Sequence, residues 1–366
     1  MRSKRPPGRR SGLLFTAAML VTVAVLAYAP PSTTVGAPSK PVEIAVQGGH
    51  PRAQYVTQKV MIPWAKRLEQ RSGGRLRVTY YDPGAIVPAE KVKEAVVANT
   101  LQIGLIYPIV PGELPFVRIM GLPGMAPSAT IAALAGWHLY ETNAQWRAQF
   151  PKEVRVLFHG AGAAIQLHTV RKAVTKLEDV AGLKLIPVIP DPWISAIQAL
   201  GGFPINIFAF DAYAALERGM ADGMFVPLAP VRALKISEVA KHTTIVDLGA
   251  NVFTIVINRG VFDSLPPDLQ QIIIEEGGEK MSEAFGRALD DGALEDGKWM
   301  LGQGNAFHSL SPTERARWIE RLVPIRERYL AELESKGMPG RKIYQESLAY
   351  MQELVRKGKF IPEYRF

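Results

Sequence analysis

Apolar and polar positions in the middle of the chain alternate between a strand period and a helix period. Short apolar runs at Leu183–Val188, Phe203–Ile207 and Met224–Val226 predict three strands. Two segments with helical apolar spacing, around Trp193–Leu200 and Ala209–Arg218, predict the helices between them. Strands and helices that alternate at this spacing indicate a parallel or mixed sheet with helices on its faces.

A pocket is expected where these strands end. In open α/β sheets a ligand lies beyond the carboxyl ends of the strands. The pattern therefore predicts that Ile186–Pro190 and Phe225–Pro227 border a binding site.

Elements of both kinds are also predicted on either side of this segment. Further strands are expected at Val42–Gln47, Leu76–Tyr80, Gln102–Tyr107, Val154–Phe158, Thr243–Val246 and Val252–Asn258. Further helices are expected at Glu90–Asn99, Ala129–Tyr140, Ala229–Lys241, Ser311–Ser335 and Tyr344–Lys357.

Two predicted helices have special features. An apolar periodic run from Tyr55 to Leu68 contains Pro63, which should kink the helix or split it in two. A long helix is predicted from Asp268 to about Leu294. At 1.5 Å per residue it would be about 40 Å long, enough to run along two domains.

Length and composition fit a soluble protein of two domains. The chain has 366 residues, of which 48% are hydrophobic and 21% charged. Its formal charge is +9, but five of the basic residues lie in the first ten positions. Without these five, 38 basic residues remain against 34 acidic ones. That excess is too small and too scattered to indicate a nucleic-acid surface.

The residue types exclude several kinds of site. The chain has no cysteine, which rules out disulfides, thiolate metal ligands and a lipid-modified cysteine. Its six histidines have no metal-type spacing, and His-Glu-x-x-His and Gly-x-Ser-x-Gly motifs are absent. Gly160-x-Gly162 follows a predicted strand, but Ile165 replaces the third glycine of a dinucleotide-binding fingerprint. A hinge turn is the better interpretation of this motif. Because the other catalytic motifs are absent too, an enzyme is the less favoured class of protein.

The first forty residues have the layout of an export signal. A basic start is followed by the uncharged apolar run Leu13–Ala29 and then by small residues at Ala27-Tyr28-Ala29 and Val35-Gly36-Ala37. Both candidate cleavage sites precede a proline, and the apolar run lies at the short end of what spans a bilayer. A cleaved signal is predicted, with an uncleaved membrane anchor as the alternative.

Motifs in both halves of the chain resemble one family. In the first half the string is Ala65-x-x-Leu68-x-x-Arg71-Ser72-Gly73-Gly74-Arg75-Leu76-x-Val78. In the second half the matching positions are Gly182-Leu183-Lys184, Gly201-Gly202-x-Pro204, Tyr213-x-Ala215-Leu216, Gly219, Asp222-Gly223 and Pro227. This order resembles the substrate-binding subunits of TRAP (tripartite ATP-independent periplasmic) transporters, the DctP-like proteins.

The resemblance covers about Val42 to Leu354 and implies a fold and a function. The implied fold is α/β, that of a two-domain periplasmic solute-binding protein of type II, with a cleft between the domains and a long spanning helix. Residues 1–39 would be export signal and linker. Domain I would comprise residues 40–163 and 252–291, and domain II residues 164–251 and 292–366.

The same resemblance implies the partners of the chain. A periplasmic receptor of this family captures a small organic solute and passes it to the small and large subunits of a membrane permease. It uses no cofactor, binds no nucleic acid, and is expected to be a monomer. A receptor for a sensory or other envelope partner is the alternative that the sequence leaves open.

Two substitutions depart from the family pattern. The family usually has an arginine, which grips the solute carboxylate, where this chain has Ile186, and often an asparagine where it has Val226. A buried carboxylate without a partner would cost several kcal/mol. Either the solute is mainly apolar, aromatic or terpenoid, or its acid end is held elsewhere. The sequence offers Arg52, Arg171, His50, His168 or backbone amides for that role.

The candidate solute-binding residues lie mostly at strand ends and crossings. They are Gln47, His50, Tyr107, Gln166, Ile186, Trp193, Phe208, Phe225, Val226 and Asn251. Gln166 stands where some members have a second arginine. Trp193, Phe203, Phe208, Phe210 and Phe225 make this half aromatic, which suits an apolar solute, although several could be ordinary core. Likewise His50 could be a solvated loop residue, Tyr107 part of the core, and Asn251 a turn cap.

Overall fold

The computed structural model describes residues 40–364 except 111, 190–191 and 208–210. The described residues from Pro41 onward form one compact unit. The predicted export signal and the candidates Phe208 and Phe210 lie outside the described residues.

Five strands form the first sheet, which we call the sheet of lobe I. Their order across the sheet is β2 (Leu76–Tyr81), β1 (Val42–Gln47), β3 (Ile103–Ile106), β10 (Val252–Asn258) and β4 (Val154–Ala161). β1 is parallel to both of its neighbours, and β10 is antiparallel to both of its own. The sheet is therefore mixed.

Six strands form the second sheet, the sheet of lobe II. Their order is β11 (Ala306–Ser309), β9 (His242–Ile245), β5 (Ile165–Thr169), β8 (Gly223–Pro227), β6 (Lys184–Ile186) and β7 (Phe203–Pro204). β6 is parallel to β7 and β8, whereas β5 is antiparallel to β8 and β9. The sequence predicts neither β5 nor β11.

The chain passes between the two sheets twice through short connections. β4 ends at Ala161 in the first sheet and β5 begins at Ile165 in the second, so the first crossing falls on the predicted hinge turn. β9 ends in the second sheet and β10 returns to the first, as predicted for Val252–Asn258.

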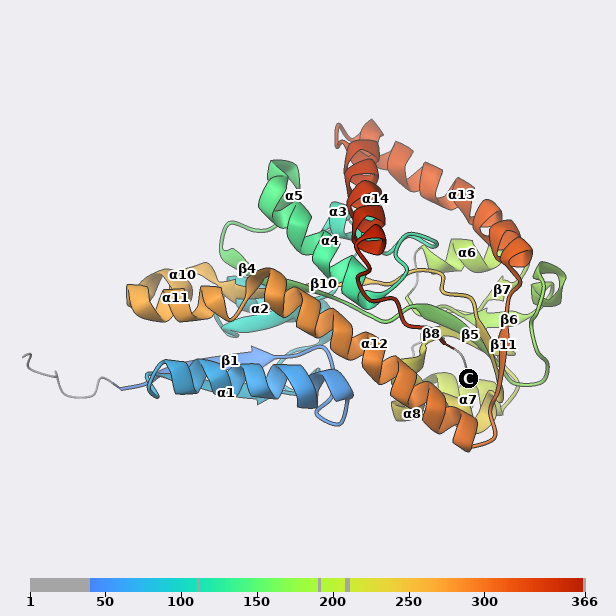
Figure 1. Cartoon of the computed structure of the whole chain (residues 1–366), viewed down its shortest axis with the longest axis horizontal. Helices are drawn as coiled ribbons and strands as arrows, with labels where there is room; N and C mark the ends of the chain where they lie inside the picture. The colour runs from blue at the N-terminus through green and yellow to red at the C-terminus, as the bar shows by residue number, and fades with distance from the viewer. Residues whose placement is uncertain (1–39, 111, 190–191, 208–210, 365–366) are drawn as a thin grey trace, which may run out of the picture. The chain divides into compact units, whose positions relative to one another are not determined.

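Helices cover both sheets (Figure 1). The helices that precede the second sheet are α1 (Ile62–Arg71), α2 (Val92–Val97), α3 (Pro115–Met120), α4 (Ala129–Thr142) and α5 (Ala144–Ala148). Those that follow are α6 (Trp193–Ala199), α7 (Ala212–Glu217), α8 (Leu228–Ala233), α9 (Ile236–Val239), α10 (Arg259–Ser264), α11 (Pro267–Glu275), α12 (Gly278–Gly302), α13 (Pro312–Ser335) and α14 (Gly340–Arg356).

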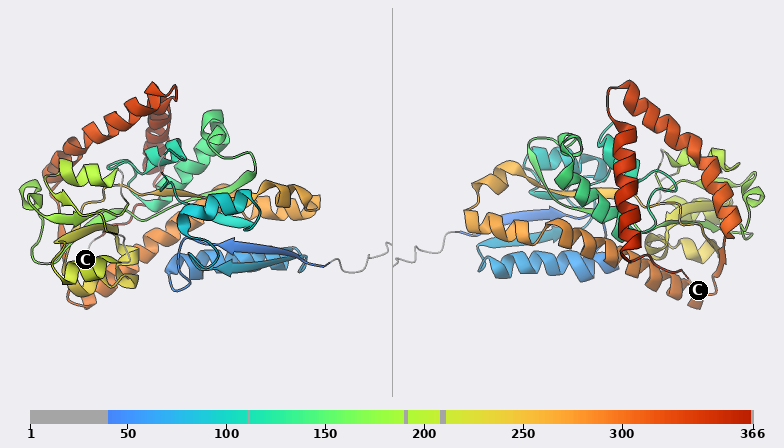
Figure 2. Two further views of the ribbon diagram at one scale, coloured as in Figure 1. Left: turned by 180° about the vertical axis from the view of Figure 1, so that it is seen from behind. Right: turned by 45° about the horizontal axis from the view of Figure 1, so that its top comes forward.

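Two long helices connect the lobes. α12 packs on α4 and β4 at one end and on α8 at the other. α13 runs from β11 toward α14, which can be followed in both views of Figure 2. The buried residues of α14 belong to the same hydrophobic core as the first sheet, whereas Trp318 and Leu322 of α13 belong to a core of the second.

Three predicted helices are interrupted in the structure, each at an identifiable residue. A π-helix over Thr57–Met61 precedes α1, and Pro63 stands in the first turn of α1, which confirms the predicted split. The segment predicted as one helix from Ala229 divides into α8 and α9 at Lys235, whose φ is +57°. The long predicted helix divides into α11 and α12 at Gly277 and Gly278, where Gly278 has φ +68°.

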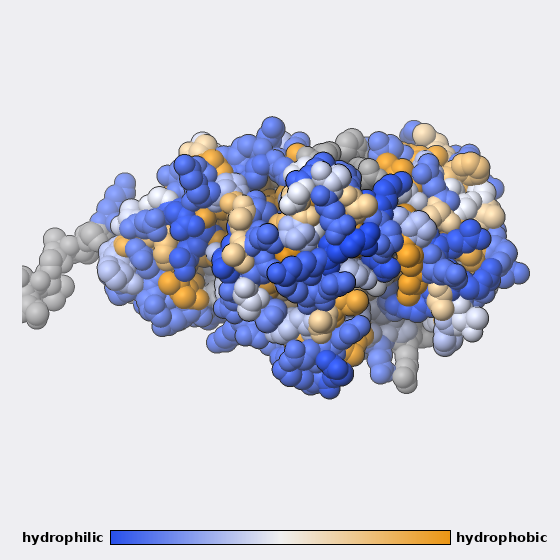
Figure 3. Space-filling model, turned by 90° about the horizontal axis from the view of Figure 1, so that it is seen from above, coloured by the Kyte–Doolittle hydropathy of each residue, from blue (hydrophilic) through white to orange (hydrophobic). Residues whose placement is uncertain are grey.

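The outer surface is mostly polar. On the face that Figure 3 shows, hydrophilic residues predominate and apolar ones gather in small scattered groups. Within the described part of the chain, no helix combines the length and apolar character needed to cross a membrane.

Candidate functional site

The carboxyl ends of five strands meet at one cleft between the lobes. In lobe I the residues just after β1, β2 and β3 include His50, Asp82 and Tyr107, and all three line the cleft. In lobe II, Val188 follows β6 and Pro227 ends β8, and both line it from the other side. This is where ligands lie in open α/β sheets, and it is the position that the sequence predicts.

The cleft holds a cavity of about 500 Å³. That volume is within the range of small-molecule sites, which is roughly 300–1,000 Å³. α12 contributes Leu289 to its wall, and β10 contributes Phe253. The cavity is therefore large enough for a drug-sized organic molecule.

The two lobes contribute different chemistry to the cavity. The described residues of lobe II that line it are all apolar: Val188, Ile189, Met224, Val226, Pro227, Ala229, Pro230, Ala233 and Leu234. The polar side chains among the described lining residues are His50, Gln54, Asp82, Tyr107 and Asn251. The first four belong to lobe I, and Asn251 directly precedes β10.

His50 enters the cavity as a neutral side chain. Its ring lies 5.5 Å from that of Phe253 and 5.7 Å from that of Phe285, between centroids. Burial among these rings lowers the pKa of His50 from 6.5 to about 4. The backbone carbonyl of His50 accepts hydrogen bonds from Tyr80 Oη at 2.8 Å and Thr57 Oγ1 at 3.0 Å, which fixes the loop.

Tyr107 and the two glycines before His50, Gly48 and Gly49, shape the same corner of the cavity. Tyr107 Oη donates to the carbonyl of Gly49 at 2.9 Å, and burial raises the pKa of its hydroxyl above the usual value. A Cβ on Gly49 would lie 2.5 Å from that hydroxyl oxygen, and one on Gly48 would lie 1.8 Å from Tyr80 Oη. Only glycine allows the two tyrosines to approach the backbone this closely.

Four predicted residues line the cavity, and five others do not. His50, Tyr107, Val226 and Asn251 are among the lining residues. Gln47 is buried beside the cleft, where its Oε1 accepts from the N–H groups of Ile86 and Val87 and its Nε2 donates to Val87 O. It holds the loop that follows β2 rather than facing the cavity.

Gln166 is the second residue of β5, directly after the first crossing, and is fully buried. Its Oε1 accepts from the backbone N–H groups of Val246 at 2.8 Å and Asp247 at 3.1 Å. Its Nε2 donates to Asp247 Oδ1 at 2.7 Å, and Arg315 from α13 pairs with the other carboxylate oxygen at 3.2 Å. This amide organises the connection between β9 and β10, where Asp247 has a φ of +45°.

The apolar candidates outside the lining are core residues. Ile186 is fully buried in a core cluster of lobe II. Trp193 and Phe225 belong to the neighbouring cluster, with ring centroids 5.4 Å apart. Phe203, interpreted from the sequence as a cleft or core aromatic, has 62% of its surface exposed.

The three remaining groups proposed as carboxylate holders lie outside the lining. His168 is buried in lobe II, with its ring nitrogens 3.0 Å from Thr243 Oγ1 and 3.1 Å from Val226 O. Arg171 is exposed near Gly219. Arg52 stands outside the cavity, where it donates to Tyr80 O and lies 3.6 Å from the carboxylate of Asp82.

Sequence reasoning missed several lining residues. Gln54, Asp82, Ala163, Met224 and Leu289 line the cavity and were not candidates. Asp82-Pro83 directly follows β2, so the strand-end rule could have found it. Leu289 comes from the middle of a helix, and only the tertiary structure brings it to the cleft.

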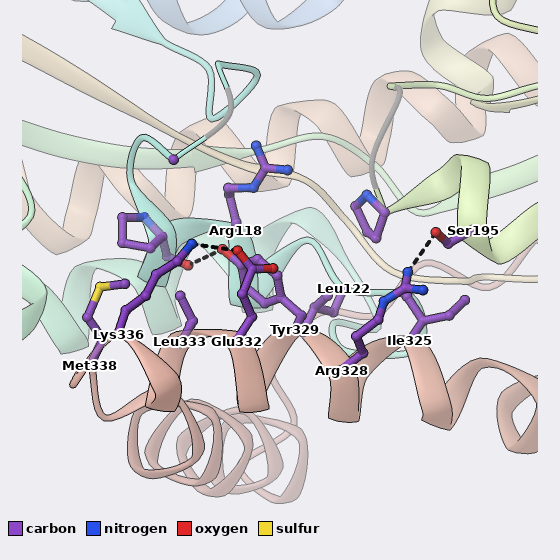
Figure 4. A pocket seen from close by; sticks show the side chains of 13 residues that line it. Arg118, Leu122, Ser195, Ile325, Arg328, Tyr329, Glu332, Leu333, Lys336 and Met338 are labelled. Atoms are coloured by element: carbon purple, nitrogen blue, oxygen red, sulfur yellow. Dashed lines mark hydrogen bonds and ion pairs between the residues drawn. The ribbon is translucent and has the colours of Figure 1, made fainter.

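A second pocket of about 650 Å³ lies beneath α13 (Figure 4). Arg118 of α3 lines it together with Arg328, Tyr329, Glu332 and Lys336 of α13. Arg328 points to Ser195 of α6, and Lys336 pairs with Glu332 at 2.6 Å. None of its lining residues lines the cleft, and no strand ends there, so we place the functional site in the cleft.

Comparison with known proteins identifies relatives of this chain. Residues 48–333 match the family described as bacterial extracellular solute-binding protein, family 7, or DctP. A stretch of 154 residues is 29% identical to the C4-dicarboxylate-binding periplasmic protein DctP of Rhodobacter capsulatus. This match covers 42% of the chain and 46% of the relative, so it spans about half of that protein's length.

Solved structures with the same fold have small molecules bound. A TRAP solute-binding protein from Rhodoferax ferrireducens, in complex with copurified benzoate, superposes with a TM-score of 0.80 at 21% identity. The comparison covers 87% of this chain and 99% of that one. A TRAP periplasmic solute-binding protein from Bordetella bronchiseptica with bound mandelate gives 0.76 at 23% identity, over 86% and 100% of the two chains.

Proposed function

Since the chain belongs to the bacterial extracellular solute-binding proteins of family 7, a family of receptors and not of enzymes, we propose that it captures a mainly apolar organic solute in its cleft and delivers it to a TRAP-type permease. The solute is aromatic, terpenoid or of similar apolar character. The protein is exported to the periplasm by its N-terminal segment and works there as a monomer.

The observation that carries the proposal is the chemistry of the cavity wall. Among the described lining residues none is a lysine or arginine, and the one charged side chain is the acid Asp82. His50 is neutral at physiological pH because burial lowers its pKa to about 4. An organic anion would lose its hydration in this cavity without gaining a cation, whereas an apolar solute gains about 25 cal/mol per Å² of buried surface.

The two departures from the family pattern support the same solute. By the resemblance, Ile186 and Val226 stand where the family has an arginine and an asparagine. Val226 lines the cavity and Ile186 is buried core directly before the loop that carries Val188 and Ile189. Benzoate and mandelate, bound by the two structural relatives, each combine a ring with a carboxylate. We propose that this chain keeps a place for the ring and has lost the carboxylate anchor.

Domain boundaries follow from the crossings. We propose that domain I comprises residues 40–163 and 252–291, because residue 163 lies between β4 and β5 and β10 begins at Val252. Residues 164–251 and 292–366 comprise domain II and the C-terminal helices, of which α14 packs on the core of lobe I. Closure of the two domains on the solute would present a loaded shape to the permease.

Thermal-shift screening of residues 40–366 tests the proposal. Aromatic and terpenoid compounds are compared with small dicarboxylates such as succinate. A compound at about 100 times its Kd adds about 2.7 kcal/mol to the free energy of unfolding, which is readily seen as a rise in Tm. The proposal predicts shifts with the apolar compounds; shifts with the dicarboxylates alone would refute it.

A further inference from the structure

We propose that His242 and His308 form a binding site for a divalent transition-metal ion, Cu²⁺, Ni²⁺ or Zn²⁺, at the edge of the sheet of lobe II. Neither histidine lines the solute cleft. The inference therefore goes beyond the proposed function and is independent of it.

The pairing of two strands brings the histidines together. β9 and β11 are parallel neighbours at one edge of the sheet. His242 is paired with Ala306, and His308 with Thr244, so the two histidines stand two positions apart on adjacent strands. Side chains two positions apart lie on the same face of a sheet. Because 66 residues separate the pair in the chain, no spacing motif reveals it.

The distance between the two rings suits a shared metal ion. His242 Nδ1 lies 3.2 Å from His308 Nε2. A bond from zinc to a histidine nitrogen is about 2.0–2.1 Å long. Two such bonds place their nitrogens about 2.9 Å apart at a right angle and about 3.3–3.4 Å apart at the tetrahedral angle. The observed separation falls between these two values.

The same distance also allows one ring to donate a hydrogen bond to the other. A neutral imidazole carries one hydrogen, on either of its two nitrogens. When a metal ion binds, the hydrogen between the rings moves to the far nitrogen of its own ring, and both facing nitrogens then offer a lone pair. Both rings stay neutral and no proton is released.

The protein engages these two rings less than its buried histidines. The rings of His159 and His168 are fully buried, and each is hydrogen-bonded to a threonine and to one further group. His242 and His308 are only half-buried, and among the described residues each ring is hydrogen-bonded to the other alone. A metal ion can therefore reach both from solvent.

The ligand type determines which ions fit. Imidazole nitrogen suits Cu²⁺, Ni²⁺ and Zn²⁺, whereas Mg²⁺ and Ca²⁺ prefer oxygen ligands. Within the described part of the chain, no third histidine, aspartate or glutamate joins the pair, so water completes the coordination. Affinity should be highest for Cu²⁺, which forms the strongest complexes of the divalent first-row metals.

A bound ion would fasten the edge of the sheet. Among the described strands, β11 pairs with β9 alone, and α13 begins shortly after it. A metal ion held by both rings adds a second link between these strands. Since the two histidines are brought together only by folding, the ion should stabilise the folded state and raise the Tm.

Calorimetry on residues 40–366 without an affinity tag tests the proposal. CuCl₂, ZnCl₂ and MgCl₂ are titrated separately at neutral pH. We expect one equivalent of Cu²⁺ to bind, Zn²⁺ to bind more weakly, and Mg²⁺ to give no binding. Zn²⁺ should also raise the Tm, whereas Mg²⁺ should not.

Two variants remove one ligand each. The second imidazole binds an ion that the first already holds, so either His242→Gln or His308→Gln should lower the affinity for Cu²⁺ and Zn²⁺ at least about tenfold. His138→Gln is the matched control. Its ring is also half-buried, but it stacks on Tyr350 with centroids 3.7 Å apart, and its loss should leave the affinity unchanged.

Electron paramagnetic resonance of bound Cu²⁺ gives an answer from the unaltered protein, even if a variant does not fold. Coordination of one Cu²⁺ by two imidazole nitrogens supports the proposal. It is overturned if Cu²⁺ is coordinated by one such nitrogen or none, if either variant binds as tightly as the unaltered protein, or if neither Cu²⁺ nor Zn²⁺ binds. None of these results bears on solute binding, which the thermal-shift screen tests separately.

Discussion

Arg328 and Tyr329 are consecutive residues of α13, and their side chains hydrogen-bond to different lobes. Arg328 Nη2 donates to Ser195 Oγ of α6 at 2.7 Å, and Tyr329 Oη donates to the carbonyl of Pro115 in α3 at 2.9 Å. α6 packs in a core of lobe II, whereas α3 belongs to the core of lobe I. The middle of α13 therefore ties the two lobes together beside the pocket of Figure 4.

Removing the tyrosine hydroxyl should weaken this tie measurably. Tyr329→Phe leaves Pro115 O, a partly buried acceptor, without its donor, so we expect the free energy of unfolding to fall by about 0.5–1.5 kcal/mol. Urea denaturation measures the change. Tyr213→Phe, which loses only an exposed bond to Glu217, serves as the control and should stay within about 0.5 kcal/mol. Equal effects of the two variants would contradict the assignment.

The amide of Gln166 should matter for stability more than for solute binding. Gln166→Leu leaves the buried N–H of Val246 and the partly buried N–H of Asp247 without an acceptor. Each lost partner costs about 1–3 kcal/mol, so a loss of at least about 2 kcal/mol is expected in urea denaturation. If the variant unfolds like the unaltered protein but loses solute affinity, Gln166 contacts the solute as the sequence suggested.

Buried neutral histidines should make the fold less stable in acid. Desolvation lowers the pKa of His168 from 6.5 to about 4, while the unfolded chain keeps the ordinary value. The unfolded state therefore binds a proton between these pH values that the folded state does not. The contribution of His168 to the free energy of unfolding is complete above about pH 6.5. It is lost as the pH falls toward 4, by up to about 1.4 kcal/mol per pH unit.

His168→Gln isolates this contribution. The pH dependence of its unfolding free energy between pH 6 and 5 should be shallower by about one proton than that of the unaltered protein. Since the other titratable groups are common to both proteins, the difference reports on His168 alone. An unchanged slope would show that His168 does not titrate on unfolding in this range.

Gly48 should be required for the shape of the cleft. In Gly48→Ala the new Cβ would lie 1.8 Å from Tyr80 Oη, so Tyr80 must move and its bond to His50 O is lost. We expect solute affinity to fall at least about tenfold in calorimetry, because the loop that carries His50 and Gln54 is displaced. Gly302→Ala meets no atom within 4 Å and should bind as before.

Most of the fold could be predicted from periodicity because its strands are short apolar runs between clear turn signals. Val42–Gln47 and Val252–Asn258 were predicted with their observed bounds. β5 (IQLHT) and β11 (AFHS) were missed because polar residues interrupt them, so neither is an apolar run. The breaks at Lys235 and Gly277 were missed because the apolar period continues across them while the backbone does not.

The site could be predicted only in part. Residues directly after strands, such as His50 and Tyr107, follow from the strand-end rule and line the cavity. The rule does not give the direction of a side chain. Gln47 ends β1, but its amide is hydrogen-bonded to Val87, and Phe225 lies within β8 with its ring in the core. Gln54 reaches the cavity from the bend before the first helix and Leu289 from within α12, and the rule considers neither position.

Filling the cavity tests the central claim most directly. Ala229 lines the cleft from α8, so Ala229→Trp should occupy part of its volume of about 500 Å³. With the strongest ligand of the thermal-shift screen, we expect calorimetry to show at least a hundredfold loss of affinity. Ala331→Trp, on the exposed face of α13, should bind like the unaltered protein. Undiminished binding by Ala229→Trp would contradict the claim that the solute lies in this cleft.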